Sequence, residues 1–369
     1  MISMNSSELI FTERPQRIFQ DCILLVQNYS YIQELKCLSS KVIGTIVGYL
    51  IPIYSIPCII INLFMAINVI MKGKKASRQL IYISGICLSS AIANIMFIWL
   101  WQYPSYGLPY TTNGTQFFSF LNISITACRF HRFMYSFSAT FMCNMRVCAS
   151  SDRCLAVWKP IMLRKFRHHY AWYVYGVVIF ISALLMLPFA IEVNWIPTKY
   201  GLQCWVQSAN VYIQIHHAFL SNLGPVQTMI LIIIDITFAF KFRQQLKKNK
   251  TDGIDVTSSK QMHRYLLLFI SAASYNVLAA TQCTFLLLAR LGSVSFIKFE
   301  SGLAYNISDI LWYINSLREV LDFVIYHRCF HVFSGITSRI SKMFYYTSKK
   351  TISVSRDISK ISVVSGHNY

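Results

Sequence analysis

Seven apolar segments dominate the sequence, and each is about as long as a helix that crosses a membrane. An α-helix rises about 1.5 Å per residue, so about 20 mostly uncharged residues span the ~30 Å hydrocarbon core of a bilayer. The sequence therefore predicts an all-α membrane protein, a bundle of seven transmembrane helices. We place the spans at residues 42–71, 80–101, 126–151, 171–190, 212–240, 265–289 and 303–326.

The composition favours a bilayer over water as the surroundings of the chain. Hydrophobic residues make up 55% of its 369 residues and charged residues only 13%, too few to cover the surface of a soluble protein. The net charge of +20 could attract nucleic acid, but so few charges overall disfavour that partner. The 11 cysteines include no Cys-x-x-Cys pair, so neither a zinc module nor a disulfide-rich scaffold is indicated.

The excess of basic over acidic residues lies almost entirely on one side of the predicted bundle. Residues 72–78, 152–170, 241–264 and 327–369 together carry +19 of the net +20. Because basic loops are retained in the cytoplasm, these segments are predicted inside and residues 1–41 outside. The predicted location is the plasma membrane, with several crossings and contacts to membrane lipids.

Glycosylation triplets agree with this orientation. One further Asn-x-Ser/Thr triplet, at Asn249, falls in a basic loop and is interpreted as a chance match. The triplets on the predicted outer side begin at Asn5, Asn28, Asn113, Asn122 and Asn306.

The sequence divides into an extracellular segment, residues 1–41, the bundle, residues 42–326, and a cytoplasmic part, residues 327–369. Apolar residues at three- and four-residue spacing begin the last part, which favours an amphipathic helix on the inner leaflet. A disordered tail is the alternative, and the Ser- and Lys-rich sequence after Tyr346 favours disorder. The spaced apolar residues are Phe330, Phe333, Ile336, Ile340 and Phe344.

Three charged residues, Arg318, Glu319 and Asp322, crowd one short stretch of the last predicted span. Charges inside a membrane are costly and usually functional. Because Arg318 and Asp322 are four residues apart, they share a helix face and are predicted to pair.

The residues around the third predicted span resemble the rhodopsin-like G-protein-coupled receptors. Asp152-Arg153-Cys154 stands at its inner end, Cys128 comes 25 residues before Arg153, and Pro160 follows seven residues after it. The family has an Asp/Glu-Arg-aromatic triplet with Cys and Pro at these spacings. At the chain's own Cys and Pro frequencies, both flanking residues match by chance in roughly seven of ten thousand trials.

Looser matches point to a subfamily. Asn62 stands at the place of the family's buried Asn, and Asn94 replaces its Asp, which puts a sodium-binding pocket in doubt. The stretch from Asp322 to Tyr326 resembles Asn-Pro-x-x-Tyr without its proline. With the run from Cys154 to Pro160, these departures are most similar to the nematode serpentine chemoreceptors of class X, or of the related gamma and V classes. That resemblance implies a chemosensory receptor of a sensory neuron or its cilium, coupled to a heterotrimeric G protein.

The resemblance also implies roles for individual residues. A disulfide between Cys128 and Cys204 would pin the second outer loop over the bundle. Arg153 would pair with Asp152 at rest and bind the G protein on release, and Asp322 and Tyr326 would belong to the same activation machinery. The alternative is that Arg153 only anchors the helix at the headgroups. Cys22 and Cys37 form a second outer bridge or remain free thiols.

The absence of two residues that other receptors use to bind their ligands narrows the class of ligand. Tyr135 stands where monoamine receptors carry Asp, and Ser316 where opsins carry the retinal-binding Lys, so neither ligand is expected. Arg129 and Arg132 lie near the outer end of the third span and favour an acidic or hydrogen-bond-accepting small molecule. Alternatively, both point to headgroups or to the disulfide loop. Further ligand-binding candidates are Tyr135, Gln282, Asp309, Trp312 and Tyr313.

Two other classes of protein were weighed against a receptor. A seven-helix ligand-gated channel, like the insect odorant receptors, has its N-terminus inside, so the accessibility of residues 1–40 separates the two. An enzyme is disfavoured because the nine histidines include no His-Glu-x-x-His, and adjacent pairs such as His168-His169 cannot share a metal. We expect no cofactor and no metal.

Overall fold

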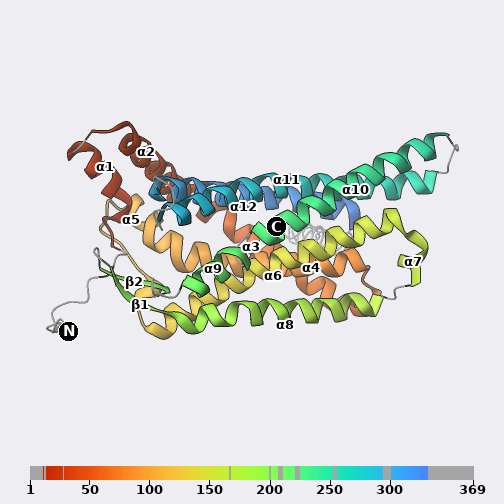
Figure 1. Ribbon diagram of the computed structural model, residues 1–369, viewed down its shortest axis with the longest axis horizontal. Coiled ribbons are helices and arrows are strands. Elements are labelled where there is room, and N and C mark those ends of the chain that lie inside the picture. Colours follow the sequence, from red (N-terminus) through yellow and green to blue (C-terminus); the bar gives the residue numbers. More distant parts are fainter. Residues whose placement is uncertain are drawn as a thin grey trace, which may run out of the picture. The chain divides into compact units, whose positions relative to one another are not determined.

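The computed structural model is almost entirely helical, with a two-stranded antiparallel sheet within the described residues (Figure 1). It describes residues 11, 14–27, 29–165, 168–198, 201–206, 211–220, 225–251, 256–293 and 301–330. The first half contains α1 (Arg17–Gln27), α2 (Tyr31–Thr45), η1 (Ile46–Leu50), α3 (Ile51–Lys72), η2 (Gly73–Lys75), α4 (Arg78–Ala93), η3 (Asn94–Gly107), α5 (Leu108–Thr111), η4 (Phe120–Asn122) and α6 (Ile125–Trp158). The second half contains α7 (Pro160–Lys165), α8 (His168–Glu192), β1 (Val193–Thr198), β2 (Gly201–Val206), α9 (Val211–Leu220), α10 (Pro225–Thr251), α11 (Val256–Ser293) and α12 (Ser301–Phe330).

Five helical stretches are long and apolar enough to cross a bilayer, and they overlap predicted spans one, two, four, five and six. This confirms an all-α membrane protein with several crossing helices. The fifth predicted span, residues 212–240, is not one helix, because α9 covers its start and α10 begins at Pro225. The other two predicted spans form α6 and α12, which carry more charged side chains and are not among the five. The five stretches are Tyr31–Lys72, Arg78–Thr111, His169–Glu192, Pro225–Lys247 and His263–Ala289.

Serine side chains begin α2, α4 and α6. The hydroxyls of Ser30, Ser77 and Ser124 each accept a hydrogen bond from the backbone N–H three residues further on. Each bond satisfies one of the N–H groups that a helix start leaves without a partner. At the other end of α3, Gly73 has a φ of +49°, a backbone conformation that favours glycine.

The first crossing helix is much longer than a membrane needs. α2, η1 and α3 join into one helix of 42 residues, about 63 Å long at the usual rise per residue. α1 packs against α2, and a disulfide joins Cys22 to Cys37. The carboxylate of Asp21 accepts a hydrogen bond from Ser40 at 2.6 Å. Residues 17–45 thus form a bridged helical hairpin, which the sequence did not predict.

Two π-helical segments, η1 and η3, pack against each other. A glycine makes this approach possible, because a Cβ on Gly107 would lie only 2.9 Å from the carbonyl oxygen of Val47. The π-helical turns lie where the first two crossing helices meet, and such turns are frequent at functional sites.

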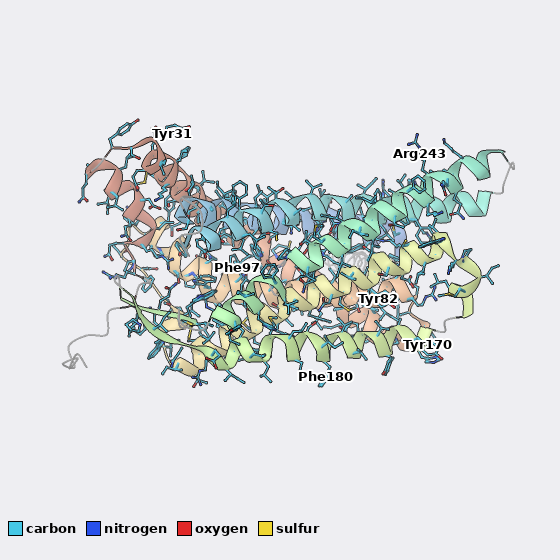
Figure 2. All side chains as sticks on the ribbon, viewed as in Figure 1. Tyr31, Tyr82, Phe97, Tyr170, Phe180 and Arg243 are labelled. Carbon is cyan, nitrogen blue, oxygen red and sulfur yellow. A yellow bond between two sulfur atoms is a disulfide. The ribbon has the colours of Figure 1, made fainter. Side chains whose placement is uncertain are left out.

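The helix α6 packs against α4, α8 and α10 and contacts β1 (Figure 1). Most of its side chains between Cys128 and Val157 are buried. By contrast, Phe180 on α8 points away from the other helices (Figure 2) and is 67% exposed. An apolar side chain placed outward on a long apolar helix is typical of contact with lipid.

The predicted outer loop after α8 forms a β-hairpin. Trp195 lies opposite Cys204 in the β1–β2 register, and its indole N–H donates to the carbonyl of Leu121 at 3.1 Å. Phe11 adds a parallel bridge to Leu202 of β2. The hairpin is therefore attached both to the segment before α6 and to the N-terminal segment.

Residues 1–323 form one compact unit and residues 324–369 a second. Of the second unit, the structure describes the end of α12, which contains the predicted activation residue Tyr326. The predicted amphipathic helix and tail lie outside the described residues, apart from Phe330 at the end of α12.

Candidate functional site

Two predicted ligand-binding residues, Tyr135 and Trp312, meet in one buried aromatic cluster. The ring of Tyr135 on α6 stacks on Phe97 of η3 with 5.2 Å between centroids. Trp312 on α12 approaches the same ring to 4.1 Å. The neighbouring Tyr313, fully buried, donates its hydroxyl hydrogen to Gln102 at 2.9 Å. The geometry brings α6, η3 and α12 together around Phe97.

Arg132 lies beside this aromatic cluster and is only 5% exposed. Its guanidinium carbon lies 4.4 Å from the ring centroid of Trp101 and 5.0 Å from that of Trp205. Trp101 itself makes an edge contact with Tyr135. Arg132 therefore faces the protein interior between the cluster and the disulfide-linked hairpin, instead of the headgroups.

Arg129 has a different position from Arg132. It is exposed, and its Nε donates to the carbonyl oxygen of Val193 at 2.9 Å. It fixes the start of β1 to α6, as the alternative interpretation of a contact with the disulfide loop predicted. Of the two arginines, Arg132 alone is placed beside the aromatic cluster.

The remaining ligand-binding candidates lie on two helices. Asp309 stands one turn before Trp312 on α12 and interacts electrostatically with Arg17 of α1. The guanidinium of Arg17 also lies over the ring of Tyr106, 5.4 Å from its centroid. Gln282 on α11 is buried, and its Oε1 has no hydrogen-bond partner within the described part of the chain.

The disulfide implied by the family resemblance is present. Cys128 at the start of α6 is bonded to Cys204 of β2, with 5.9 Å between their Cα atoms. A crosslink between residues 76 apart constrains a large loop of the unfolded chain. It also fixes the hairpin, and with it Trp205, beside Arg132.

The implied pair between Asp152 and Arg153 is corrected by the structure. Adjacent residues point about 100° apart on a helix, so the two side chains meet different helices. Asp152 faces α4, where Arg78 lies 3.4 Å away and Gln79 donates to it at 2.5 Å. Arg153 faces α10 and α11, where it lies 3.9 Å from Asp235.

Arg153 connects three helices at this end of α6. One guanidinium nitrogen donates to the carbonyl of Leu268 on α11 at 2.6 Å, and the other to the Ser150 hydroxyl at 2.7 Å. Its acidic partner Asp235 accepts a further bond from Asn276 of α11 at 2.6 Å. Asp235 was missed in the sequence, although a carboxylate alone in an apolar run is itself a functional signal.

The predicted pair between Arg318 and Asp322 is confirmed at 2.6 Å. Asp322 also lies 3.9 Å from Arg146 of α6, and Ser271 of α11 donates to it. Three buried side chains, each from a different helix, therefore share one carboxylate. Arg146 was recognised in the sequence only as a charge that makes its span less apolar.

A second carboxylate, the half-buried Glu319, lies one turn before Asp322 on α12. It accepts hydrogen bonds from Ser90 at 2.5 Å, from Asn62 at 3.3 Å and from Asn94 at 3.4 Å. A carboxylate from α12 thus lies beside Asn94. The sequence placed Glu319 in a charged stretch but carried no signal for its partners on α3 and α4.

The described glycosylation triplets differ in accessibility. Asn113 is exposed in a turn with a φ of +50°, and Asn122 is half-buried just before α6. Asn306 lies within α12, where its Nδ2 donates to the Ser39 hydroxyl at 2.8 Å. A glycan on that nitrogen would displace this bond. Asn5 and Asn28 lie outside the described residues.

The fold and these contacts define an all-α membrane protein with buried charged networks between its helices. No protein-family model matches the chain, and no curated protein matches it. The arguments for function therefore come from the residues themselves.

Proposed function

We propose that the chain is a chemosensory G-protein-coupled receptor of the plasma membrane, similar to the nematode serpentine chemoreceptors, that binds an extracellular small molecule. The observation that carries this proposal is the pair of contacts at the two ends of α6. Cys128 is crosslinked to Cys204 at one end, and Arg153 bridges to Asp235 at the other. The separation of 25 residues between Cys128 and Arg153 corresponds to about 38 Å of helix, which matches a bilayer crossing.

In this proposal α6 and α12 are the third and seventh crossings, so that the N-terminus is outside and the tail inside. The helix α6 has 34 residues, about 51 Å, which is long enough to span. Its charges Arg132, Arg146 and Arg153 are buried and lie against aromatic or acidic side chains. Paired charges that face the bundle are tolerated in a membrane far better than charges that face lipid.

Arg153 is the residue we assign to coupling. At rest its guanidinium connects α6 to α10 and α11. A state in which these helices separate would release its donors for the carboxyl-terminal helix of a heterotrimeric G protein. Because ligand and G protein both favour that state, each would strengthen the binding of the other. Asp152, Asp322 and Tyr326 remain candidates of the same machinery.

The aromatic cluster beside Arg132 is the proposed ligand site. Tyr135 and Trp312 share Phe97 as a neighbour, and Arg132 supplies a buried positive charge next to them. Aromatic walls with one cation suit a small molecule that has an apolar body and an acidic or hydrogen-bond-accepting group. We expect Asp309 and Gln282 to influence the ligand from α12 and α11.

The test measures nucleotide exchange in membranes of cells that express the full chain with a heterotrimeric G protein. We expect agonist-independent exchange above that of untransfected membranes. Arg153→Ala should abolish it at an unchanged surface level, whereas Asp235→Asn, which releases Arg153, should raise it several-fold. Lys159→Gln removes an exposed charge at the end of α6 and is the matched control. Equal exchange in all three variants would contradict the proposal.

A ligand-gated channel remains the second candidate, and two measurements separate it from a receptor. An epitope before residue 11 should be labelled on intact cells if the chain is a receptor, and only after permeabilisation if it is a channel of the odorant-receptor type. A ligand-evoked current that persists after G-protein blockade would replace the receptor proposal by the channel.

A further inference from the structure

Tyr275 of α11 makes an unusual pair of contacts inside the protein. Its side chain is only 1% exposed. The guanidinium carbon of Arg146 on α6 lies 3.7 Å from its ring centroid, and that of Arg318 on α12 lies 5.4 Å away. Both distances fall within the range in which the face of an aromatic ring attracts a cation. One ring on α11 is thus a common neighbour of cations from two other helices.

The same two arginines meet at Asp322. Arg318 lies 2.6 Å from one carboxylate oxygen and Arg146 lies 3.9 Å from the other. Asp322 therefore stands between two like charges, which repel each other strongly in a medium of low dielectric constant. The nearby carboxylate of Glu319 also attracts both arginines. The negative face of the Tyr275 ring supplies additional attraction to both.

The groups that α11 contributes to the contacts around Asp322 carry no charge. Ser271 donates its hydroxyl hydrogen to Asp322, and its carbonyl accepts from Arg318 at 3.2 Å. One turn further on, Tyr275 presents its ring, with Cys143 of α6 3.5 Å from its hydroxyl. Without the ring, α11 would keep Ser271 as its contact to Asp322 but would lose its attraction to Arg146.

We propose that Tyr275 is a positioning residue that holds α11 against α6 and α12, and that it thereby sets the fraction of molecules in the resting state. The inference deepens the proposed function, on which it rests for its effect on signalling. The positioning itself is a property of the helices and does not depend on a G protein.

The direct test is a distance measurement between spin labels on the full-length protein in lipid nanodiscs. Lys159→Cys at the end of α6 and His263→Cys on α11 are exposed labelling positions. We compare the parent with Tyr275→Phe, which keeps the ring, and with Tyr275→Leu, which removes it. Loss of a desolvated cation–π contact changes an equilibrium by about tenfold or more. Tyr275→Leu should therefore raise the ratio of separated to closed helices about tenfold, and Tyr275→Phe should resemble the parent.

A matched control removes a different ring from the same helix. Phe269 on α11 packs 5.2 Å from Phe238 of α10, so Phe269→Leu should leave the ratio near that of the parent. An equal shift in Phe269→Leu, or no shift in Tyr275→Leu, overturns the proposal. Arg146→Gln removes the nearer cation and keeps the ring, so it should shift the ratio in the same direction. If Tyr275→Leu does not fold, the ratio measured for Arg146→Gln tests the proposal instead.

Nucleotide exchange distinguishes failure of the two proposals. If Tyr275→Leu separates the helices and raises agonist-independent exchange, both stand. If the helices separate and every variant lacks exchange, the receptor function fails while Tyr275 keeps its positioning role. If exchange is present in the parent but the labels do not move in Tyr275→Leu and Arg146→Gln, the positioning role fails and the receptor function stands.

Discussion

Ser90 on α4 donates its hydroxyl hydrogen to Glu319 on α12, with 2.5 Å between the two oxygens. The same carboxylate oxygen accepts from Asn62 of α3, so one side chain of α12 connects the first two crossing helices. An acceptor that serves several donors inside a protein is costly to remove, because each donor is then left without a partner.

We expect Glu319→Ala to lower the free energy of unfolding by about 3 kcal/mol, since it strands buried donors on two helices. Glu319→Gln keeps an oxygen that accepts from Ser90 and should cost clearly less. Thermal unfolding of the purified protein in detergent, followed by circular dichroism, measures both. Equal losses would show that the hydrogen bonds contribute little.

Replacing Cys128 or Cys204 by Ser should destabilise the protein more than replacing Cys22. The two disulfides join residues 76 and 15 apart, so loop closure predicts about 4 and about 3 kcal/mol respectively. The first bond also fixes the hairpin beside Arg132, whereas the second fixes α1 to α2. We expect Cys204→Ser to abolish surface expression and Cys22→Ser to reduce it, as measured by flow cytometry of an epitope-tagged chain. The reverse order would contradict this assignment.

Gly107→Ala should destabilise the contact between η1 and η3. Its new methyl group would lie 2.9 Å from the carbonyl oxygen of Val47, and backbone atoms must move apart at a cost of about 1 to 3 kcal/mol. Gly176→Ala on α8 is the control, because its methyl group meets nothing within 4 Å. There the change to alanine should stabilise the helix by up to about 1 kcal/mol. Melting midpoints that fall in both variants would refute the steric argument.

Glycosylation at Asn113 tests the predicted orientation. Thr115→Ala removes the triplet while leaving Asn113 in its positive-φ turn, and it should increase gel mobility by one glycan step. Asn306→Gln should leave mobility unchanged, because the Asn306 amide already donates to Ser39 inside the protein. Treatment of the parent with an N-glycosidase provides the reference. Unchanged mobility of Thr115→Ala would count against an outer location of this loop.

Five of the seven predicted spans overlap helices that are long and apolar enough to cross a membrane, because apolar length is a local property that a single segment carries. Arg318 and Asp322 were predicted to pair for the same reason, since their four-residue spacing fixes their common face. The partner of Arg153 was predicted wrongly, because the acid nearest in sequence, Asp152, points toward another helix. Its partner Asp235 lies more than 80 residues away, and only the packing of α6 against α10 brings the two together.

The β-hairpin and α1 were missed for a different reason. Both lie in segments whose composition is mixed, and neither the strand alternation around Trp195 nor the helical spacing around Ile18 exceeds what a loop can show by chance. The disulfides that stabilise them were anticipated, Cys128–Cys204 from the family resemblance and Cys22–Cys37 as one of two alternatives, but a disulfide does not by itself predict a strand or a helix. Long-range pairing, rather than local preference, decides these two elements.

The unusual length of the first crossing helix links the bilayer to the proposed ligand site. The N-terminal part of this helix contains Ile43 and Val47. The Cys22–Cys37 bond joins it to α1, which contains Ile18. All three residues belong to the same buried cluster as Tyr135. A thinner or thicker membrane changes the tilt of a long helix, so lipid composition should alter how tightly this cluster closes. The sensitivity of the protein would then depend on the cell that expresses it as well as on its ligand.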